Sequence, residues 1–296
     1  MQPTQPADLL TRVRRLEIRS RHLVEDLFAG QSESVFKGRG IEFEEVRPYV
    51  PGDEVRTIDW NVTARLGAPY VKRFVEEREL TVLLIVDISR SMRFGTAGAE
   101  KRELAAELCA VLGFAAMRNN DRVGLVLAGE RVEHFVPPSR GRQHLLRMLR
   151  DVLGLSAEHP GTHLGEAVRF VLRTTRRRSL VFWMSDFEDR LDARDWRVLS
   201  RRHDVTAFAL TDPRDLEIPA AGWVELEDLE SGRRILADTG NRRVRAAYAK
   251  AAEARRRDAQ RVLEQARCSV VEVRTDASYL PVLMRYFSAK RRGRVR

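Results

Sequence analysis

Residues 83–91 read LLIVDISRS, and this stretch decides the fold of the chain. An apolar strand runs directly into the pattern D-x-S-x-S, in which Asp87, Ser89 and Ser91 occupy alternate positions. Alternate residues of an extended segment point the same way, so one carboxylate and two hydroxyls can face a single small cation. Neither Cys nor His takes part in the pattern, which makes it a poor site for zinc or iron.

Two later segments carry oxygen ligands at matching places. Thr162 lies in residues 160–165, PGTHLG, a turn that opens into a helical pattern, and Asp186 follows the apolar strand 179–185. Ligand sites of doubly wound sheets collect at the carboxyl ends of strands, where Asp87 and Asp186 both fall. Helix capping alone would explain one of these loops but not three that converge, so we predict a metal site.

Strand and helix patterns alternate along most of the chain. Apolar runs predict strands at residues 70–75, 81–86, 121–128, 180–185, 205–210 and 269–273, with hairpin partners at 131–136 and between 223–228 and 234–237. Apolar residues at helical spacing predict helices at residues 8–29, 99–118, 143–153, 162–174, 192–201, 241–267 and 278–290. This alternation predicts an α/β fold with a doubly wound, mainly parallel sheet.

The order of these motifs resembles that of a known family of domains. D-x-S-x-S, then a Thr in a helix-opening loop, then an Asp after a later strand is similar to the metal-ion-dependent adhesion site of von Willebrand factor A domains. Residues 38–60, GRGIEFEEVRPYVPGDEVRTIDW, resemble the signature of the bacterial family called domain of unknown function 58. Members of that family carry an A-like domain and are often associated with MoxR-type AAA ATPases.

The resemblance implies a specific ligand set and a specific role. Mg²⁺, or Mn²⁺ in its place, would be surrounded, partly through water, by Asp87, Ser89, Ser91, Thr162 and Asp186. Because only two of these ligands are charged, an acidic side chain of a partner protein would complete the coordination. The chain departs from the family pattern at Phe187, where many A domains have Gly, and we expect this ring to narrow the approach to the metal.

The resemblance also implies a division of the chain and a partner. We expect an N-terminal helix and strand-rich subdomain at residues 1–78 and an A-like domain with C-terminal helices at residues 79–296. By resemblance, the chain acts with a MoxR-type AAA ATPase in the assembly, activation or remodelling of client proteins.

The signature segment contains alternating charges that have two interpretations. Charged residues and one aromatic residue form a candidate partner-docking set: Arg39, Glu42, Arg47, Asp53, Arg56, Asp59 and Trp60. The same charges can instead form an internal ion-pair network that fixes the strand-rich subdomain. We interpret Trp60 as a packing anchor of that subdomain.

Composition favours a cytoplasmic protein with a real core. Hydrophobic residues make up 43% of the 296 residues, and no apolar run approaches the roughly 20 residues that span a bilayer. The N-terminus lacks the pattern of a signal peptide, and the two cysteines, Cys109 and Cys268, show no metal-binding or redox spacing, so we expect buried thiols.

The formal net charge of +10 raises nucleic acid as an alternative partner. The excess is concentrated in the predicted helix 241–267 and in the tail 290–296, and a solvated basic face is the simpler interpretation.

An Mg²⁺-dependent hydrolase is a further alternative, although no nucleophile elbow, phosphate-binding loop or dinucleotide fingerprint is present. His159 and His163 flank Thr162 but lack a third-ligand pattern for zinc. We therefore expect a non-catalytic binding module.

Overall fold

A computed structural model describes residues 6–27, 42–75, 80–96, 98–157, 161–229 and 232–291. The chain forms two compact units, one of residues 36–80 and one of residues 1–35 and 81–296. The larger unit contains the central sheet and all of the candidate metal ligands, and it is described first.

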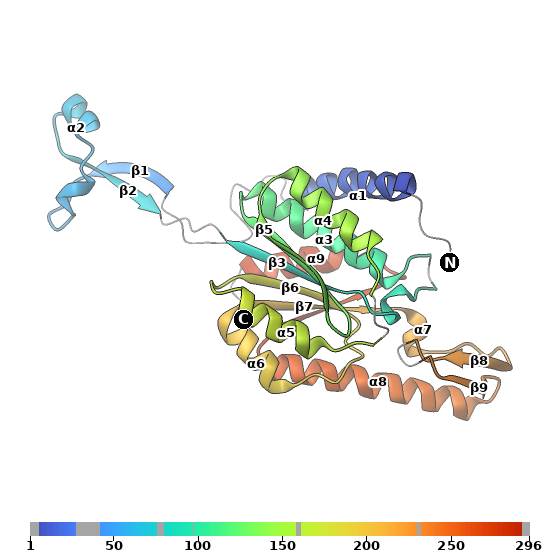
Figure 1. Ribbon diagram of the computed structural model, residues 1–296. Coiled ribbons are helices and arrows are strands. Elements are labelled where there is room, and N and C mark those ends of the chain that lie inside the picture. Colours follow the sequence, from blue (N-terminus) through green and yellow to red (C-terminus); the bar gives the residue numbers. More distant parts are fainter. Residues whose placement is uncertain are drawn as a thin grey trace. The chain divides into compact units, whose positions relative to one another are not determined.

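A six-stranded sheet forms the centre of the larger unit (Figure 1). Its strands, in sheet order, are β10 (Ser269–Arg274), β7 (Asp204–Thr211), β6 (Leu180–Ser185), β3 (Thr81–Asp87), β4 (Arg122–Ala128) and β5 (Val132–Ser139). All neighbours are parallel except β5, which pairs antiparallel with β4 at the edge. The prediction of a doubly wound, mainly parallel sheet is confirmed.

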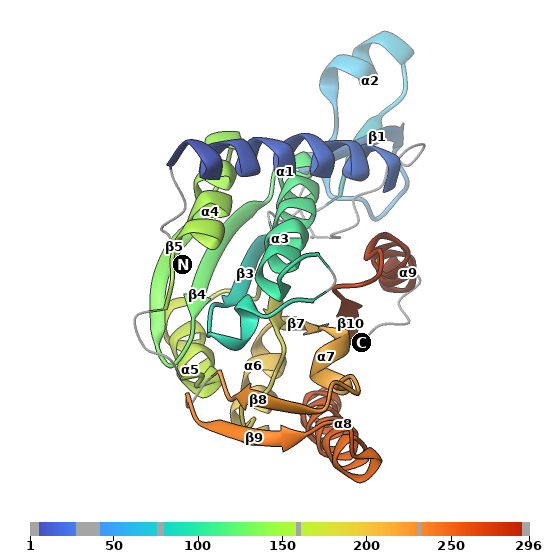
Figure 2. The same cartoon turned by 90° about the vertical axis from the view of Figure 1, so that its right-hand side faces the viewer.

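Helices cover both faces of this sheet (Figure 2). One face carries α1 (Pro6–Leu27), α3 (Lys101–Arg118), α4 (Arg142–Gly154) and α9 (Leu280–Arg291). The other carries α5 (Leu164–Thr174), α6 (Ala193–Arg202) and α8 (Arg242–Gln265). Two covered faces require strands that are apolar on both sides, which explains the continuous hydrophobic runs of β3 and β6.

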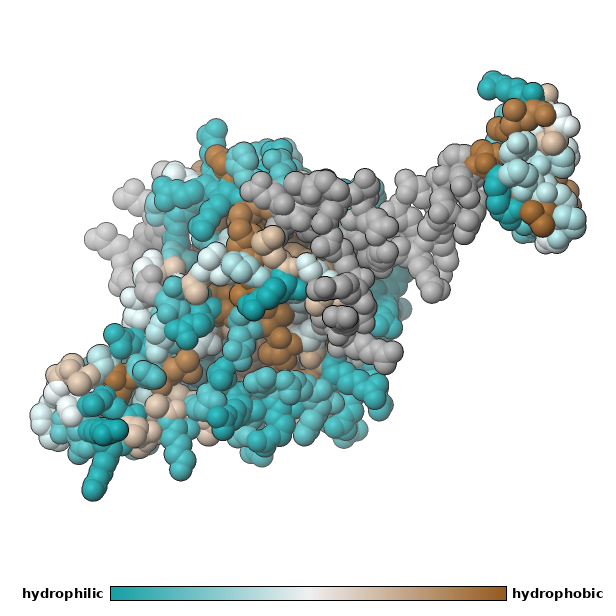
Figure 3. Space-filling model, turned by 180° about the vertical axis from the view of Figure 1, so that it is seen from behind, coloured by the Kyte–Doolittle hydropathy of each residue, from teal (hydrophilic) through white to brown (hydrophobic). Residues whose placement is uncertain are grey.

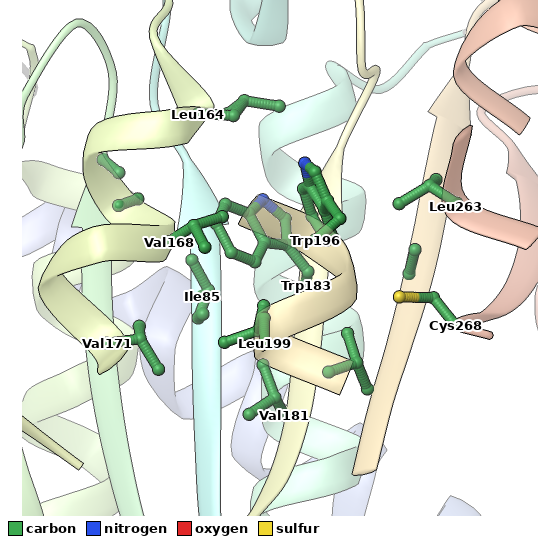
Figure 4. Packing of buried hydrophobic residues seen from close by; sticks show 14 of the residues in the cluster. Ile85, Leu164, Val168, Val171, Val181, Trp183, Trp196, Leu199, Leu263 and Cys268 are labelled. Carbon is green, nitrogen blue, oxygen red and sulfur yellow. The ribbon is translucent and has the colours of Figure 1, made fainter. Parts of the chain in front are cut away.

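The core beneath α5 and α6 is built around two tryptophans. Trp183 of β6 packs against Trp196 of α6 with ring centroids 4.6 Å apart, and Leu164, Val168 and Leu199 surround the pair (Figure 4). Both indole rings are fully buried, so each removes a large apolar area from water. This packing fixes the end of β6, from which Asp186 emerges.

Short elements complete the larger unit. They are the 3-10 turn η2 (Ser91–Arg93), α7 (Pro213–Leu216) and a separate hairpin of β8 (Trp223–Glu227) and β9 (Arg234–Asp238). Within the described ranges, none of the helices combines the length and the apolar character needed to cross a membrane.

Helix α1 packs on α3 and α4 within the larger unit, which differs from the expected division at residue 78. Arg12 pairs with Glu103, and Arg19 pairs with Glu107 of α3 at 2.9 Å. Buried Glu17 accepts a 2.8 Å hydrogen bond from Arg142 of α4. These ion pairs join segments remote in sequence, so the helical pattern by itself did not reveal the assignment of α1 to the larger unit.

The small unit is a hairpin closed by a short helix. β1 (Glu42–Pro48) pairs antiparallel with β2 (Tyr70–Val75), and a 3-10 turn, η1 (Val55–Thr57), and α2 (Trp60–Leu66) lie between them. The Asp59 side chain caps α2 by accepting from the backbone N–H of Asn61 and Val62. Gly67, with φ 71°, ends the helix in the left-handed conformation that glycine adopts without steric cost.

Candidate metal centre

The D-x-S-x-S segment forms a buried polar turn at the carboxyl end of β3. Asp87 and Ser89 are fully buried, and the Ser89 backbone N–H donates to Asp87 Oδ1 at 2.9 Å. The hydroxyls of Ser89 and Ser91 lie 3.0 Å apart, and Ser91 begins the turn η2. One carboxylate and two hydroxyls therefore gather within a single turn, as their spacing predicts.

Asp186 reaches the same region from the neighbouring strand. β6 runs parallel to β3, with Val86 opposite Met184, so the two strands end side by side. The Asp186 side chain is almost fully buried, and its Oδ1 accepts a long 3.4 Å hydrogen bond from Glu188 N. The negative charge of Asp186 raises the pKa of Asp87, so the two carboxylates lie within electrostatic reach of each other.

Ser185 is a residue of this site that the sequence pattern did not identify. Its hydroxyl donates to Asp87 Oδ2 at 2.6 Å and accepts from Phe187 N at 2.9 Å. Both carboxylate oxygens of Asp87 are thus oriented by donors, from Ser89 N and from Ser185. The contact depends on strand register, which no local motif encodes.

The pKa of Asp87 is raised to about 7. Burial is the largest cause, the charge of Asp186 adds to it, and hydrogen bonds from Ser185 and Ser89 oppose it. A carboxylate in this environment gains from a nearby cation, because a positive charge would favour its ionised form.

The structure brings the loop of Thr162 close to the D-x-S-x-S turn. His163 N donates to Gly129 O at 2.9 Å. A Cβ placed on Gly129 would lie 3.5 Å from Gly161 O and 4.0 Å from Ser89 N. The Thr162 loop and the Ser89 turn therefore meet at a glycine that leaves little room between them.

Lys101, the first residue of α3, provides a cation that the sequence analysis missed. Its side chain is fully buried, and its Nζ donates to Asp186 Oδ2 at 2.7 Å and to Asp215 Oδ2 at 2.9 Å. Burial alone would lower the pKa of this ammonium group, but the charges of Asp186 and Asp215 raise it above its ordinary value. Lys101 is therefore charged and holds one of the predicted metal ligands.

The donor set fits a hard cation. All five predicted ligands offer oxygen, and two carboxylates with three hydroxyls suit Mg²⁺ or Mn²⁺ better than a softer metal. In the part of the chain that the structure describes, no three His, Cys, Asp or Glu side chains form a metal-binding group. A site here would accordingly rest on two carboxylates and hydroxyls, with Asp186 exchanging its contact with Lys101 for the metal.

A cleft of about 750 Å³ opens beside the site in the larger unit. Ser91, Phe94 and Lys101 form one wall, next to Glu188 and Asp215. The other walls come from the β8–β9 hairpin and from α8, with the following lining residues: Leu226, Glu227, Asp228, Leu229, Arg233, Ile235, Tyr248 and Arg255. Of the predicted ligands, Ser91 lines this cleft, so the cleft reaches the edge of the candidate metal site.

Asp212 connects three loops at this end of the sheet. Its carboxylate accepts from Thr96 N at 2.8 Å, from Thr96 Oγ1 at 2.6 Å and from Thr275 Oγ1 at 2.7 Å. Thr96 follows β3, Asp212 follows β7 and Thr275 follows β10. The loops around the site are therefore joined by one buried acid.

Phe187 does not narrow the approach to the metal, which corrects the expectation from the sequence. Its ring is buried in the core and packs edge-on against Trp196, with centroids 5.9 Å apart. Its φ of 55° lies in the left-handed region, which explains why a glycine is suited to this position. The backbone turn is kept, and the side chain is directed into the hydrophobic core.

The candidate docking residues of the small unit fall into different environments. Arg47 forms two hydrogen bonds to Asp53, at 2.8 and 2.6 Å, and Asp59 caps α2, so these three have internal roles. Arg56 is exposed. The interpretation of Trp60 as a packing anchor is wrong, because its side chain is 64% exposed at the start of α2. The sequence predicted a strand-rich segment here, but residues 60–66 form helix α2. Trp60 is the first residue of this helix, and the helix directs its ring outward.

Some residues named from the sequence lie outside the described residues. These are Arg39 and His159, together with the side chain of Glu42. His163, which is described, is exposed and lies 3.3 Å from Arg169 through its Nε2 atom.

The basic helix α8 has a hydrophilic outer surface, part of the teal lower edge in Figure 3. Many of its arginines are engaged in ion pairs. Arg255 pairs with Glu188, Arg256 with Glu253 and Glu272, Arg257 with Glu253 and Arg261 with Asp258. This pairing supports the interpretation of a solvated charged face.

Comparison with known families agrees with the signature in residues 38–60. A family model described as "Protein of unknown function DUF58" matches residues 45–258. The chain belongs to the DUF58 family. The uncharacterized protein Rv1480 of Mycobacterium tuberculosis is 35% identical to this DUF58 protein over 290 residues, which cover 96% of this chain and 90% of the relative. The uncharacterized protein MAV169 of Mycobacterium avium is 31% identical over 166 residues, 53% of this chain and 95% of the relative.

Solved structures similar to this DUF58 protein include two with low sequence identity. The conserved hypothetical protein BatB of Bacteroides thetaiotaomicron has a TM-score of 0.47 and 17% identity, covering 72% of this chain and 99% of that one. The SpRpn10 VWA domain has a TM-score of 0.39 and 13% identity, covering 70% of this chain and 94% of that one. The strand order of the central sheet by itself confirms the expected doubly wound, mainly parallel fold.

Proposed function

We propose that this DUF58 protein is a protein-interaction module whose binding depends on Mg²⁺ or Mn²⁺. The observation that carries the proposal is the convergence of Asp87, Ser89 and Ser91 with Asp186 at the ends of two adjacent central strands. Packing alone does not account for a buried carboxylate with two neighbouring hydroxyls and a second acid beside it, because burying such groups is costly.

The metal would be held by Asp87, Ser89, Ser91, Thr162 and Asp186. A bound divalent cation supplies a Lewis-acidic position that accepts an additional carboxylate. With two charged ligands from this chain, the ion retains affinity for an acidic side chain of a partner. The cleft of about 750 Å³ beside Ser91 and Lys101 is the place where we propose that a peptide segment carrying such a side chain enters.

The partner classes follow from the family resemblance. We assign a MoxR-type AAA ATPase as the binding partner, and a client protein as the source of the acidic residue. The exposed Trp60 and Arg56 of the small unit are candidate contacts for either one.

No observation favours the two alternative functions over this one. The thiols of Cys109 and Cys268 are buried, and burial raises the pKa of Cys268 to about 12, which agrees with the expectation of buried thiols. The ion pairs along α8 reduce the free positive charge available to nucleic acid.

Affinity capture from the native lysate tests the proposal. The protein is used as bait in Mg²⁺ and in EDTA, and Asp87→Asn is compared with Asp258→Asn, an exposed carboxylate on α8. Chelation and Asp87→Asn should each weaken client binding at least about tenfold, the scale expected for loss of a buried charge contact. Asp258→Asn should bind as the unaltered protein does.

The same capture separates the two partners. In EDTA the bait could retain a MoxR-type ATPase and lose the client. That result would place the metal at the contact with the client. Capture of a client that is unaffected by both EDTA and Asp87→Asn would refute the metal-dependent function. Absence of any AAA ATPase under all nucleotide conditions would refute that partner.

A further inference from the structure

Lys101 occupies an unusual position for a lysine. The side chain is 1% exposed, and its ammonium bridges the acids that follow β6 and β7, at 2.7 Å to Asp186 and 2.9 Å to Asp215. A buried ammonium is retained only when anions compensate its lost hydration. Lys101 is therefore a fixed internal cation next to the candidate metal site.

We infer that Lys101 competes with the divalent metal for Asp186 and moves onto Asp215 when the metal binds. This inference rests on the proposed metal site and adds the residue that controls its occupation. The ammonium needs no new partner for the exchange, because it already donates to Asp215. Asp186 is released by breaking one hydrogen bond, while Lys101 stays paired.

The local charge balance favours such an exchange. Four carboxylates lie near one another, those of Asp87, Asp186, Glu188 and Asp215, and the described cations in contact with them are Lys101 and Arg255. With every group ionised, these four acids outnumber the two cations, and a divalent ion would reduce the net negative charge that remains. Lys101 alone therefore does not neutralise the cluster, and it leaves Asp87 without a cation partner among the described residues.

A test uses Mn²⁺ as the probe and measures its dissociation constant directly, from the electron paramagnetic resonance signal of the free ion. Lys101→Met keeps an unbranched side chain, one heavy atom shorter, and removes the competing charge. We expect it to bind Mn²⁺ at least about tenfold more tightly than the unaltered protein, the scale of one close charge pair.

Asp215→Asn provides the opposite change. It leaves Lys101 with Asp186 as its remaining carboxylate partner, so Mn²⁺ binding should weaken several-fold. Glu188→Gln is the matched control, because it removes one negative charge from the same cluster and Glu188 pairs with Arg255. Asp215→Asn should weaken binding clearly more than Glu188→Gln does.

The double variant isolates the role of the lysine. In the Lys101→Met background, Asp215→Asn should have a smaller effect on the Mn²⁺ dissociation constant than it has when Lys101 is present. Equal effects in both backgrounds would mean that Asp215 acts on the metal without the lysine, and would overturn the inference.

The outcomes also separate this inference from the metal site itself. Mn²⁺ binding of equal strength in the unaltered protein and Lys101→Met would overturn the lysine's role and leave the site intact. No binding by any variant would overturn both. Lys101→Met could unfold in the absence of metal. Recovery of its circular dichroism on adding Mn²⁺ would then support the inference. If the variant stays unfolded, the comparison of Asp215→Asn with Glu188→Gln decides the question.

Discussion

The Ser185 hydroxyl donates a 2.6 Å hydrogen bond to Asp87 Oδ2, linking the last residues of two neighbouring parallel strands. The bond acts on the ionised carboxylate and lowers its pKa, against the larger effects of burial and of Asp186. The proposed metal would bind the ionised form, so we expect Ser185 to position the Asp87 carboxylate and to favour that form.

Mn²⁺ binding should depend on pH through Asp87. Its pKa of about 7 means that protons compete with the metal as pH falls through that value. Ser185→Ala should move the midpoint of this dependence to higher pH by about one unit, because it removes a donor to the carboxylate. Calorimetric titration between pH 5.5 and 8.5 measures the shift. Ser200→Ala is the control, since Ser200 lies on α6 and its hydroxyl donates to Ala266 O. A midpoint that Ser185→Ala does not move would contradict the role of Ser185.

Asp87→Asn and Asp186→Asn should each abolish Mn²⁺ binding while the protein stays folded. The folded-state pKa of Asp87 lies above its ordinary value of 3.8, so its ionisation opposes folding as pH rises from about 4 to about 7. Asn cannot ionise, and metal-free Asp87→Asn should therefore melt at or above the temperature of the unaltered protein at pH 8. A melting temperature lower by several degrees would assign Asp87 a structural role.

His203 should limit stability in mild acid. The imidazole is buried, neither ring nitrogen has a hydrogen-bond partner among the described residues, and burial, with Arg202 and Arg178, lowers its pKa to about 4. The unfolded chain takes up the proton near pH 6.5 and the folded chain only near pH 4, so stability is lost as pH falls through this window.

His203→Leu should remove that loss and be more stable than the unaltered protein at pH 5, by roughly 1–3 kcal/mol. Urea denaturation at pH 5 and pH 7.5 gives the free energy of unfolding at each pH. His22→Leu, at an exposed position on α1, should leave the pH dependence unchanged. If His203→Leu also leaves the pH dependence of the free energy of unfolding unchanged, the acid sensitivity comes from another residue.

Trp60→Ala tests the small unit as a docking surface. Because the indole is largely exposed, its removal should leave the melting temperature within about one degree of the original, as for other exposed substitutions. If the ring contacts the ATPase, capture should fall about tenfold or more, as for an aromatic hot spot. Unchanged capture would exclude Trp60 from the interface, and Leu66→Ala on the same helix is the matched control.

Deleting residues 292–296 tests the contribution of the basic tail. The deletion removes three arginines beyond the end of α9, so the slope of log affinity for DNA against log salt should fall by up to about three. Metal-dependent capture should be unaffected. A client lost with the tail would move the interface away from the metal site.

The sequence could predict the sheet because the signals for its strands are local. The runs ending at Asp87 and Asp186 are continuous and apolar, as strands buried on both faces must be, and the ends of parallel strands meet at one edge. The convergence of these two acids follows from topology alone.

Other parts of the site depend on contacts that no local pattern encodes. Ser185 meets Asp87 through strand register, and Lys101 reaches Asp186 and Asp215 from the first turn of a helix. In sequence, Lys101 is one more charged residue at a helix start, where exposure is the usual outcome. Only the folded structure reveals that it is buried between two acids.

Asp212 has a mechanical consequence for the rim of the sheet. Its hydrogen bonds to Thr96 and Thr275 join the connections that leave β3, β7 and β10. A molecule that pushes on the connection after β3 must also move the start of α7, which carries Asp215, or break one of these bonds. A displacement at the end of one strand is therefore transmitted to the ends of the other two, and the loops after β3, β7 and β10 move together.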